Sequence, residues 1–303
     1  MDGTDLMDSR ESAITSLPAS GPLDLAYDES STVYIKPIDG WNTLDISELW
    51  RFRELIFFLV WRDVKVRYKQ TILGAAWAIL QPLLMMVVFS IFFGRLAKVS
   101  SGDLPYPLFA IAGLLPWTFF STAVTSAGNS VVGSERLITK VYFPRLAVPI
   151  GAVGAAVVDF VIALGLLVIM MFGYGVRPGW SFLLIPVAFT SIAFAALGLG
   201  ILLAALSVAY RDFKHVIPFM MQLGLFATPS VYMQPDSSAA SGSMQWLLRL
   251  NPMTTQIEVF RAVALGGPIP WGPFVLATLF SILLLLFGCL YFRKVETNFA
   301  DII

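Results

Sequence analysis

The chain has 303 residues, of which 57% are hydrophobic and 13% are charged, and its mean hydropathy is +0.77. Soluble domains carry roughly 25% charged residues, so this composition excludes an ordinary soluble globular domain. The formal net charge is zero, so the placement of the charges is more informative than their sum. Cys289 is the single cysteine, so no disulfide can form within the chain. His215 is the single histidine, and neither residue alone can make a metal site or a catalytic cluster.

Residues 1–45 differ from the rest of the chain in composition. They contain nine acidic residues but only two basic ones, Arg10 and Lys36, together with several prolines and no long apolar run. Such a segment cannot bury enough apolar surface to fold by itself. We therefore predict an acidic and mostly disordered tail, to which the sequence assigns no function.

Residues 46–70 have the periodicity of an amphipathic helix. At about 100° per residue, Trp50 and Phe57 fall opposite a basic face. That face is formed by Arg51, Arg62, Lys65 and Lys69. A basic face backed by aromatic residues is typical of a helix in the lipid interface, where Arg53 and Arg67, on the apolar side, would snorkel to the headgroups. An amphipathic helix that faces a protein core is the alternative.

The chain becomes apolar after Gln70 and carries no charge until Arg95. A helix needs about 20 apolar residues to cross the hydrocarbon of a bilayer. The transmembrane domain, residues 71–303, contains six candidates: residues 71–93, 108–132, 147–172, 182–208, 215–232 and 273–292. We therefore predict an all-α polytopic membrane protein with six transmembrane helices and an N-terminal amphipathic interface helix.

Basic residues indicate the orientation of these spans. The tail with its interface helix, the loops 133–146 and 209–214 and the C-terminal end together hold 15 of the 20 Lys and Arg residues. Cytoplasmic loops carry an excess of Lys and Arg, so these segments are predicted on the cytoplasmic side. With six spans, both termini then lie in the cytoplasm.

The loop 133–146 is predicted to carry a short helix that begins after Ser134 as N-cap. Arg136 and Lys140 lie one turn apart beside an apolar stripe. The segment is too short to span a membrane and too apolar for a free loop. It is therefore either a cap on the helix bundle or a docking helix for a cytoplasmic partner. The candidate docking residues are Glu135, Arg136, Leu137, Lys140, Tyr142 and Phe143.

The segment between the fifth and sixth predicted spans contains two short helical patterns. Residues 244–250 form the first, and Asn251 and Pro252 begin the second as N-cap and first helical residue. Helices of about 7 and 14 residues cannot each cross a bilayer. We predict a re-entrant hairpin entering from outside, in which Glu258 and Arg261 pair at i, i+3. An ordinary extracellular amphipathic hairpin is the alternative.

Two kinds of side chain within the spans are candidates for function. Asp159 lies near the middle of the third span with no basic partner in the spans, so it is expected to be protonated or hydrogen-bonded to a neighbouring Ser or Thr. Aromatic residues are abundant, and they either pack and anchor the spans or line a path for sugars. The candidates for such a path are Trp77, Phe89, Phe92, Trp117, Phe119, Phe120, Phe226 and Tyr232.

The sequence contains no G-x-x-x-x-G-K-[ST] pattern, no H-E-x-x-H, no G-x-S-x-G and no carboxylate cluster. The chain is therefore not predicted to hydrolyse a nucleotide, to act as an enzyme by itself, or to bind a cofactor. Energy for any transport has to come from another chain or from an ion gradient.

Five motifs together resemble one family. They are RDVKVRYKQTILGAAWAILQPL from Arg62, GLLPWTFFS from Gly113, ERLITKVYFPRLAVP from Glu135, LSVAYRDF from Leu206 and NPMTTQIEVFRAVALGG from Asn251. Over about residues 46–303 the chain is similar to the transmembrane subunit of ABC transporters of the polysaccharide-export type, which export O-antigen, capsule or teichoic acid.

The resemblance implies a homodimer that carries two ABC ATPase subunits, with ATP and Mg²⁺ bound on those partners. It also implies that the loop helix near 135–143 contacts the ATPase. The segment 244–265 would form outer gate helices, and aromatic residues would line a continuous channel for a lipid-linked polysaccharide. The expected location is the cytoplasmic membrane of a bacterium, with membrane lipid but no nucleic acid as a partner.

Three other functions fit parts of the sequence. A drug or small-lipid exporter of the same superfamily would favour a closed lateral pocket over a sugar-sized tunnel. An ion-coupled secondary transporter or channel is disfavoured because Asp159 stands alone and no internal repeat is visible. A membrane glycosyltransferase is disfavoured because its acidic motif is missing.

Overall fold

The structure of the protein, a computed structural model, describes residues 46–69, 76–96, 104–228 and 251–296. Within these ranges every regular element is a helix, which confirms the predicted all-α class. The described residues belong to one unit, Trp41–Ile303. The predicted acidic tail, Tyr232 and the predicted short helix at 244–250 lie outside the described residues.

The predicted N-terminal helix is present as two pieces, α2 (Ile46–Arg51) and α3 (Arg53–Lys69), which Phe52 separates. Helix α3 packs against α7 (Ala147–Gly173) at two glycines of α7. A Cβ added to Gly151 would lie 2.9 Å from Cβ of Leu59, and one added to Gly154 would lie 2.5 Å from Cγ2 of Val60. The opposite side of this segment exposes large apolar side chains, namely Trp50, Phe57, Phe58 and Trp61.

Five helical segments in the described ranges are long and apolar enough to cross a membrane. They are α4 (Ala76–Phe89) with a π-helical continuation (Ser90–Leu96), α5 (Tyr106–Gly133), α7, a 3-10 turn (Trp180–Leu184) with α8 (Ile185–Ala209), and α12 (Trp271–Glu296). They correspond to the first four predicted spans and to the sixth. Helix breaks therefore fall close to the places that the apolar periodicity predicted.

The fifth predicted span corresponds to α9 (Phe213–Ala227), a helix of 15 residues. This is shorter than the about 20 residues that a perpendicular crossing requires. The predicted span continues to position 232, and the description stops at Thr228. The described residues therefore establish five candidate spans, and a sixth stays a prediction.

Helix α5 is the centre of the packing and contacts α4, α7, α8, α9 and α11 (Pro252–Leu265). Four phenylalanines join α5, α7, α8 and α11. The ring of Phe119 lies 4.7 Å from that of Phe189, Phe189 lies 4.3 Å from Phe160, and Phe160 lies 5.8 Å from Phe260. Because aromatic pairs favour such tilted and offset contacts, this cluster fixes the helices that surround it.

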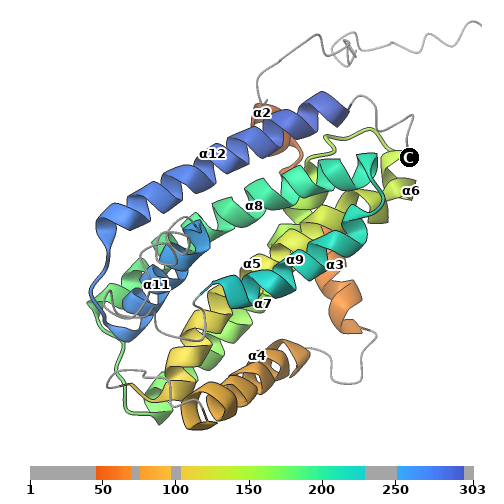
Figure 1. Ribbon diagram of the computed structural model, residues 1–303. Helices are drawn as coiled ribbons and strands as arrows, with labels where there is room; N and C mark the ends of the chain where they lie inside the picture. Colours follow the sequence, from red (N-terminus) through yellow and green to blue (C-terminus); the bar gives the residue numbers. More distant parts are fainter. Residues whose placement is uncertain (1–45, 70–75, 97–103, 229–250, 297–303) are drawn as a thin grey trace, which may run out of the picture. The chain divides into compact units, whose positions relative to one another are not determined.

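Helix α8 lies between α5 and α12 (Figure 1). The backbones of α8 and α12 approach closely because glycines face each other. A Cβ on Gly198 would lie 2.6 Å from the backbone nitrogen of Leu285, and one on Gly288 would lie 2.5 Å from the carbonyl oxygen of Gly198. Small residues at such contacts are typical of helix pairs in membranes.

Candidate functional site

A charged cluster joins the end of α3 to the middle of α7. Nη1 of Arg67 forms an ion pair with Oδ2 of Asp159, and the hydroxyl of Tyr68 donates a hydrogen bond to Oδ1 of the same carboxylate. The expectation of a Ser or Thr partner for Asp159 is therefore wrong, because its hydrogen bonds come from Arg67 and Tyr68. The carboxylate takes its partners from the helix that precedes the first span, so both of its oxygens are satisfied.

Tyr68 is held in its neutral, donating form. Burial raises the pKa of its hydroxyl above the usual range, and the nearby Arg67 guanidinium counteracts that rise only in part. The phenol therefore stays protonated at any physiological pH and keeps its hydrogen bond to Asp159.

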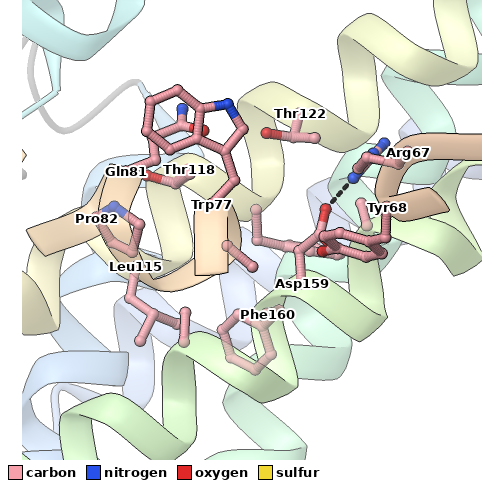
Figure 2. A pocket seen from close by; sticks show the side chains of 14 residues that line it. Arg67, Tyr68, Trp77, Gln81, Pro82, Leu115, Thr118, Thr122, Asp159 and Phe160 are labelled. Atoms are coloured by element: carbon pink, nitrogen blue, oxygen red, sulfur yellow. Dashed lines mark hydrogen bonds and ion pairs between the residues drawn. The ribbon is translucent and has the colours of Figure 1, made fainter. Parts of the chain in front are cut away.

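This cluster forms one end of a cavity of about 240 Å³ between α3, α4, α5 and α7. Figure 2 shows the polar side chains that line it, Gln81, Thr118 and Thr122 among them, together with the indole of Trp77. The remaining wall is apolar and comprises Ala78, Pro82, Leu115, Phe119, Ala156, Phe160 and Ala163. The cavity therefore combines aromatic rings, neutral hydrogen-bonding groups and one paired charge.

The aromatic residues predicted to line a sugar path fall into two groups. Phe89, Trp117, Phe119 and Phe120 are buried within the subunit, where Trp117 lies against Gly224 of α9. Trp77, Phe92 and Phe226 are exposed. Trp77 and Phe119 are the two members that meet in the cavity, and Tyr232 lies outside the described residues. Their role in transport stays a prediction.

The predicted docking loop contains a single helical turn, α6 (Glu135–Ile138), which is shorter than predicted. Ser134 holds the N-cap position, but its side chain makes no capping hydrogen bond. Among the candidate docking residues, Glu135, Arg136, Lys140 and Tyr142 are exposed, Leu137 is half-buried and Phe143 is buried. The loop thus inserts apolar side chains into the bundle and presents its charges outward.

The predicted start and end of the outer helix are confirmed. The side chain of Asn251 accepts a hydrogen bond of 3.0 Å from the backbone nitrogen of Met253, and Pro252 opens the 14-residue helix α11. Gly266 ends it with φ = 84°, a left-handed conformation that glycine adopts readily. Glu258 is exposed, whereas the Arg261 guanidinium carbon lies 3.8 Å from the centroid of the Phe109 ring.

Helix α11 is buried on most sides, and a polar network ties it to α8 and α12. Nε2 of Gln256 donates to Oγ of Ser191 at 2.9 Å and to Oγ of Ser281 at 2.8 Å. Ser281 in turn donates to the carbonyl of Ala277, and the Ser191 hydroxyl lies 2.9 Å from that of Thr278. The predicted ion pair between Glu258 and Arg261 stays a prediction.

The sequence pattern did not single out Gln81, Thr118, Thr122 or Gln256 as functional candidates. Each is a neutral polar residue in an apolar helix, and such residues carry no distinctive spacing. One signal did exist for the charged cluster. Arg67 falls on the apolar side of the predicted interface helix, where a cation needs a partner.

These features define a class of protein, a helical chain with five segments in its described ranges that are long and apolar enough to cross a membrane, and without a nucleotide-binding motif in its sequence. Residues 54–265 match the family model of the ABC-2 type transporters. The chain belongs to this family.

Curated relatives match over nearly their whole lengths. The chain is 33% identical to the O-antigen export system permease protein RfbA of Myxococcus xanthus over 84% of this chain and 98% of the relative. It is 26% identical to a protein of the same name from Klebsiella pneumoniae, over 82% of this chain and 95% of the relative. It is also 23% identical to the polysialic acid transport protein KpsM of Escherichia coli, over 78% and 91% of the two chains.

Proposed function

We propose that this chain is the membrane-spanning subunit of an ATP-driven exporter that moves a lipid-linked polysaccharide across the bacterial cytoplasmic membrane. The similarity to the O-antigen permease of Myxococcus xanthus, which covers 98% of that relative, is the observation that carries the proposal. Another relative is named a polysialic acid transport protein, and polysialic acid is also a polysaccharide. The sequence has no phosphate-binding loop, so ATP and Mg²⁺ bind to a separate ABC ATPase.

The proposed assembly is a homodimer that carries two ATPase copies, with six spans in each subunit and both termini in the cytoplasm. One contact supports the placement of the loop 133–146 and the C-terminal end on the same side of the membrane. The backbone nitrogen of Arg145 donates to Oε1 of Glu296 at 3.3 Å, and Nη1 of Arg145 donates to the carbonyl of Glu296. The predicted fifth span, residues 215–232, supplies the remaining crossing in this proposal.

The interface helix is part of the same proposal. Trp50, Phe57, Phe58 and Trp61 expose aromatic rings that water would disfavour and that the headgroup region of a bilayer accepts. The guanidinium of Arg53 lies 5.6 Å from the centre of the Trp50 ring, a contact typical of cations beside aromatic faces. This helix then lies in the cytoplasmic interface before the first span begins.

The ATPase is proposed to dock on the loop around α6. Phe143 and Ile138 anchor the loop in a core that also contains Leu146 and Phe292. Arg136 faces outward, and a rigid loop with exposed charges can transmit the movement of a motor domain. Replacing Glu135, Arg136 and Lys140 by alanine should leave the chain in the membrane but uncouple ATP hydrolysis from export; full export would contradict this site.

The outer gate is proposed to include α11 and the segment before it. Glu258 is the exposed charge of α11, and two such helices in a dimer could narrow the exit. The test is to measure ion leak through the reconstituted dimer. Glu258→Ala should change this leak while expression stays near normal.

A cellular experiment tests the proposed function. The chain and the ABC ATPase encoded with it are expressed in a bacterium that makes a lipid-linked polysaccharide but lacks the permease that exports it. Surface polysaccharide is then measured with antibody on intact cells. We expect export with the active ATPase and none when its phosphate-binding lysine is replaced. Polysaccharide that stays inside with both active proteins present contradicts the proposal.

A further inference from the structure

The cavity between α3, α4, α5 and α7 has polar side chains that the fold does not use. Gln81, Thr118 and Thr122 line it, and none of their side chains forms a hydrogen bond to another described residue. Ala78 and Pro82 also line the cavity, and Pro82 has no backbone N–H to donate to the carbonyl of Ala78 one turn earlier. Gln81 is exposed, and Thr118 and Thr122 are half-buried, so their donors and acceptors are open to a ligand or to water in this partly enclosed site.

We propose that this cavity binds one neutral sugar ring attached to a membrane lipid. The inference rests on the proposed function only in that an exporter of lipid-linked polysaccharide has such a ligand available. Three features of the cavity select this chemistry: its aromatic wall, its neutral polar groups and the paired state of its charges.

The aromatic wall fits the apolar face of a sugar ring. The side chain of Trp77 is 49% exposed, so its indole is available at the cavity, and Phe119 and Phe160 lie deeper in the same wall. Aromatic rings provide large apolar contact area, and the Trp nitrogen adds a polar edge. Figure 2 shows the indole of Trp77 and the hydroxyl of Thr122 among the side chains that line the cavity.

The neutral polar groups fit hydroxyls. The amide of Gln81 and the hydroxyls of Thr118 and Thr122 can each donate or accept. A sugar hydroxyl has the same ability, so one ring can satisfy several of them at once. An acyl chain in the cavity would leave all three without partners, which disfavours it relative to a sugar ring.

The paired charges disfavour an anionic headgroup. Asp159 neutralises Arg67, so a phosphate at this point meets no net positive charge and lies close to a carboxylate. A neutral ring meets no such repulsion and can use the guanidinium N–H groups that Asp159 does not occupy. Phosphate recognition at this cavity is therefore disfavoured.

Size and access agree with a single ring on a lipid. Pockets that enclose drug-sized ligands have volumes of roughly 300–1,000 Å³, and a cavity of about 240 Å³ is smaller. It therefore holds one ring and not a chain of sugars. Much of α4 beside it is exposed, including Ile79, Leu84 and Met85, so a lipid can approach along this helix.

Native mass spectrometry tests the proposal. The full-length chain with its ATPase is placed in nanodiscs that contain equal amounts of monoglucosyl diacylglycerol, phosphatidylglycerol and diacylglycerol, and the lipids retained by the released complex are counted. We expect the glucosyl lipid to be enriched over diacylglycerol. Trp77→Ala and the nearly isosteric Thr122→Val should each lower this enrichment about tenfold, which corresponds to about 1.4 kcal/mol.

Trp180→Ala is the matched control, because Trp180 is 91% exposed and does not line the cavity. Equal enrichment in the wild type, Trp77→Ala and Thr122→Val overturns the proposal, as does retention of phosphatidylglycerol that depends on these two residues. Export in cells without a Trp77-dependent enrichment leaves the proposed function standing and removes the sugar site. Enrichment that depends on Trp77, in a chain that does not export, supports the sugar site and contradicts the proposed function.

Discussion

At the scale of single residues, the contact between Arg67, Tyr68 and Asp159 decides how the N-terminal helix meets the bundle. A carboxylate inside a membrane protein is costly when it has no partner, and here each oxygen has one. The side chains of Arg67 and Asp159 are 33% and 24% exposed, so the pair lies between a surface ion pair and a buried one. Both partners must be removed together to avoid leaving an unpaired charge.

A double-mutant cycle checks this account of the pair. Arg67→Ala and Asp159→Ala should each destabilise the purified chain by about 1–2 kcal/mol, between the values for exposed and buried pairs. The double variant should lose less than the sum of the two, because neither charge is then left alone. Thermal unfolding in detergent measures all four proteins, and additive losses would show that the two side chains do not interact.

Sequence reasoning succeeded at residues whose partners are local and failed where the partner is distant. Asn251 and Pro252 were identified as a helix start because capping involves residues two or three positions away. Arg67 and Asp159 are 92 positions apart, and no periodicity links them. The unusual place of Arg67 on an apolar helix face indicated that a partner exists, but the bundle had to be seen before that partner could be named.

At the scale of helices, the contact between α8 and α12 depends on two glycines. The Cβ of an alanine at 198 would lie 2.6 Å from the backbone nitrogen of Leu285, and a backbone cannot turn aside as a side chain can. The helices must separate to admit a methyl group. Gly165 in α7 is different, because nothing lies within 4 Å of the position that its Cβ would take.

We therefore expect opposite effects from the same substitution at two helical glycines. Gly198→Ala should lower the thermal midpoint of the purified protein. Gly165→Ala should leave it unchanged or raise it, because alanine favours a helix over glycine by about 1 kcal/mol. Fluorescence-detected size exclusion after heating provides the comparison. Equal effects at Gly198 and Gly165 would contradict the close contact of α8 and α12.

The positions of the long apolar helices were predicted best. The length of the short helix in the loop 133–146 was predicted least well. Apolar runs of more than 20 residues specify a span regardless of its neighbours. The loop helix was expected near residues 135–143, but α6 ends at Ile138. There the loop turns so that Phe143 enters the core, and this tertiary burial overrides the local helical pattern.

At the scale of the whole molecule, the proposed topology has six spans with both termini in the cytoplasm. Cysteine labelling checks it in intact cells after Cys289 has been replaced. Single cysteines at positions 101, 179 and 238 should react with an impermeant reagent, and a cysteine at Ser134 should react only after lysis. Position 238 distinguishes six spans from five, because its labelling from outside requires the chain to cross the membrane between the cytoplasmic loop 209–214 and that position.

The proposed function requires that ATP hydrolysis by a partner drives a lipid-linked polysaccharide through this subunit. Proteoliposomes that contain the chain and its ABC ATPase, loaded with the lipid-linked polysaccharide on the ATPase side, provide the most direct measurement. Appearance of polysaccharide on the other side is followed with an impermeant glycosidase. We predict transfer that requires hydrolysable ATP, as the proposed function demands. Transfer that follows an imposed ion gradient and ignores ATP would contradict it.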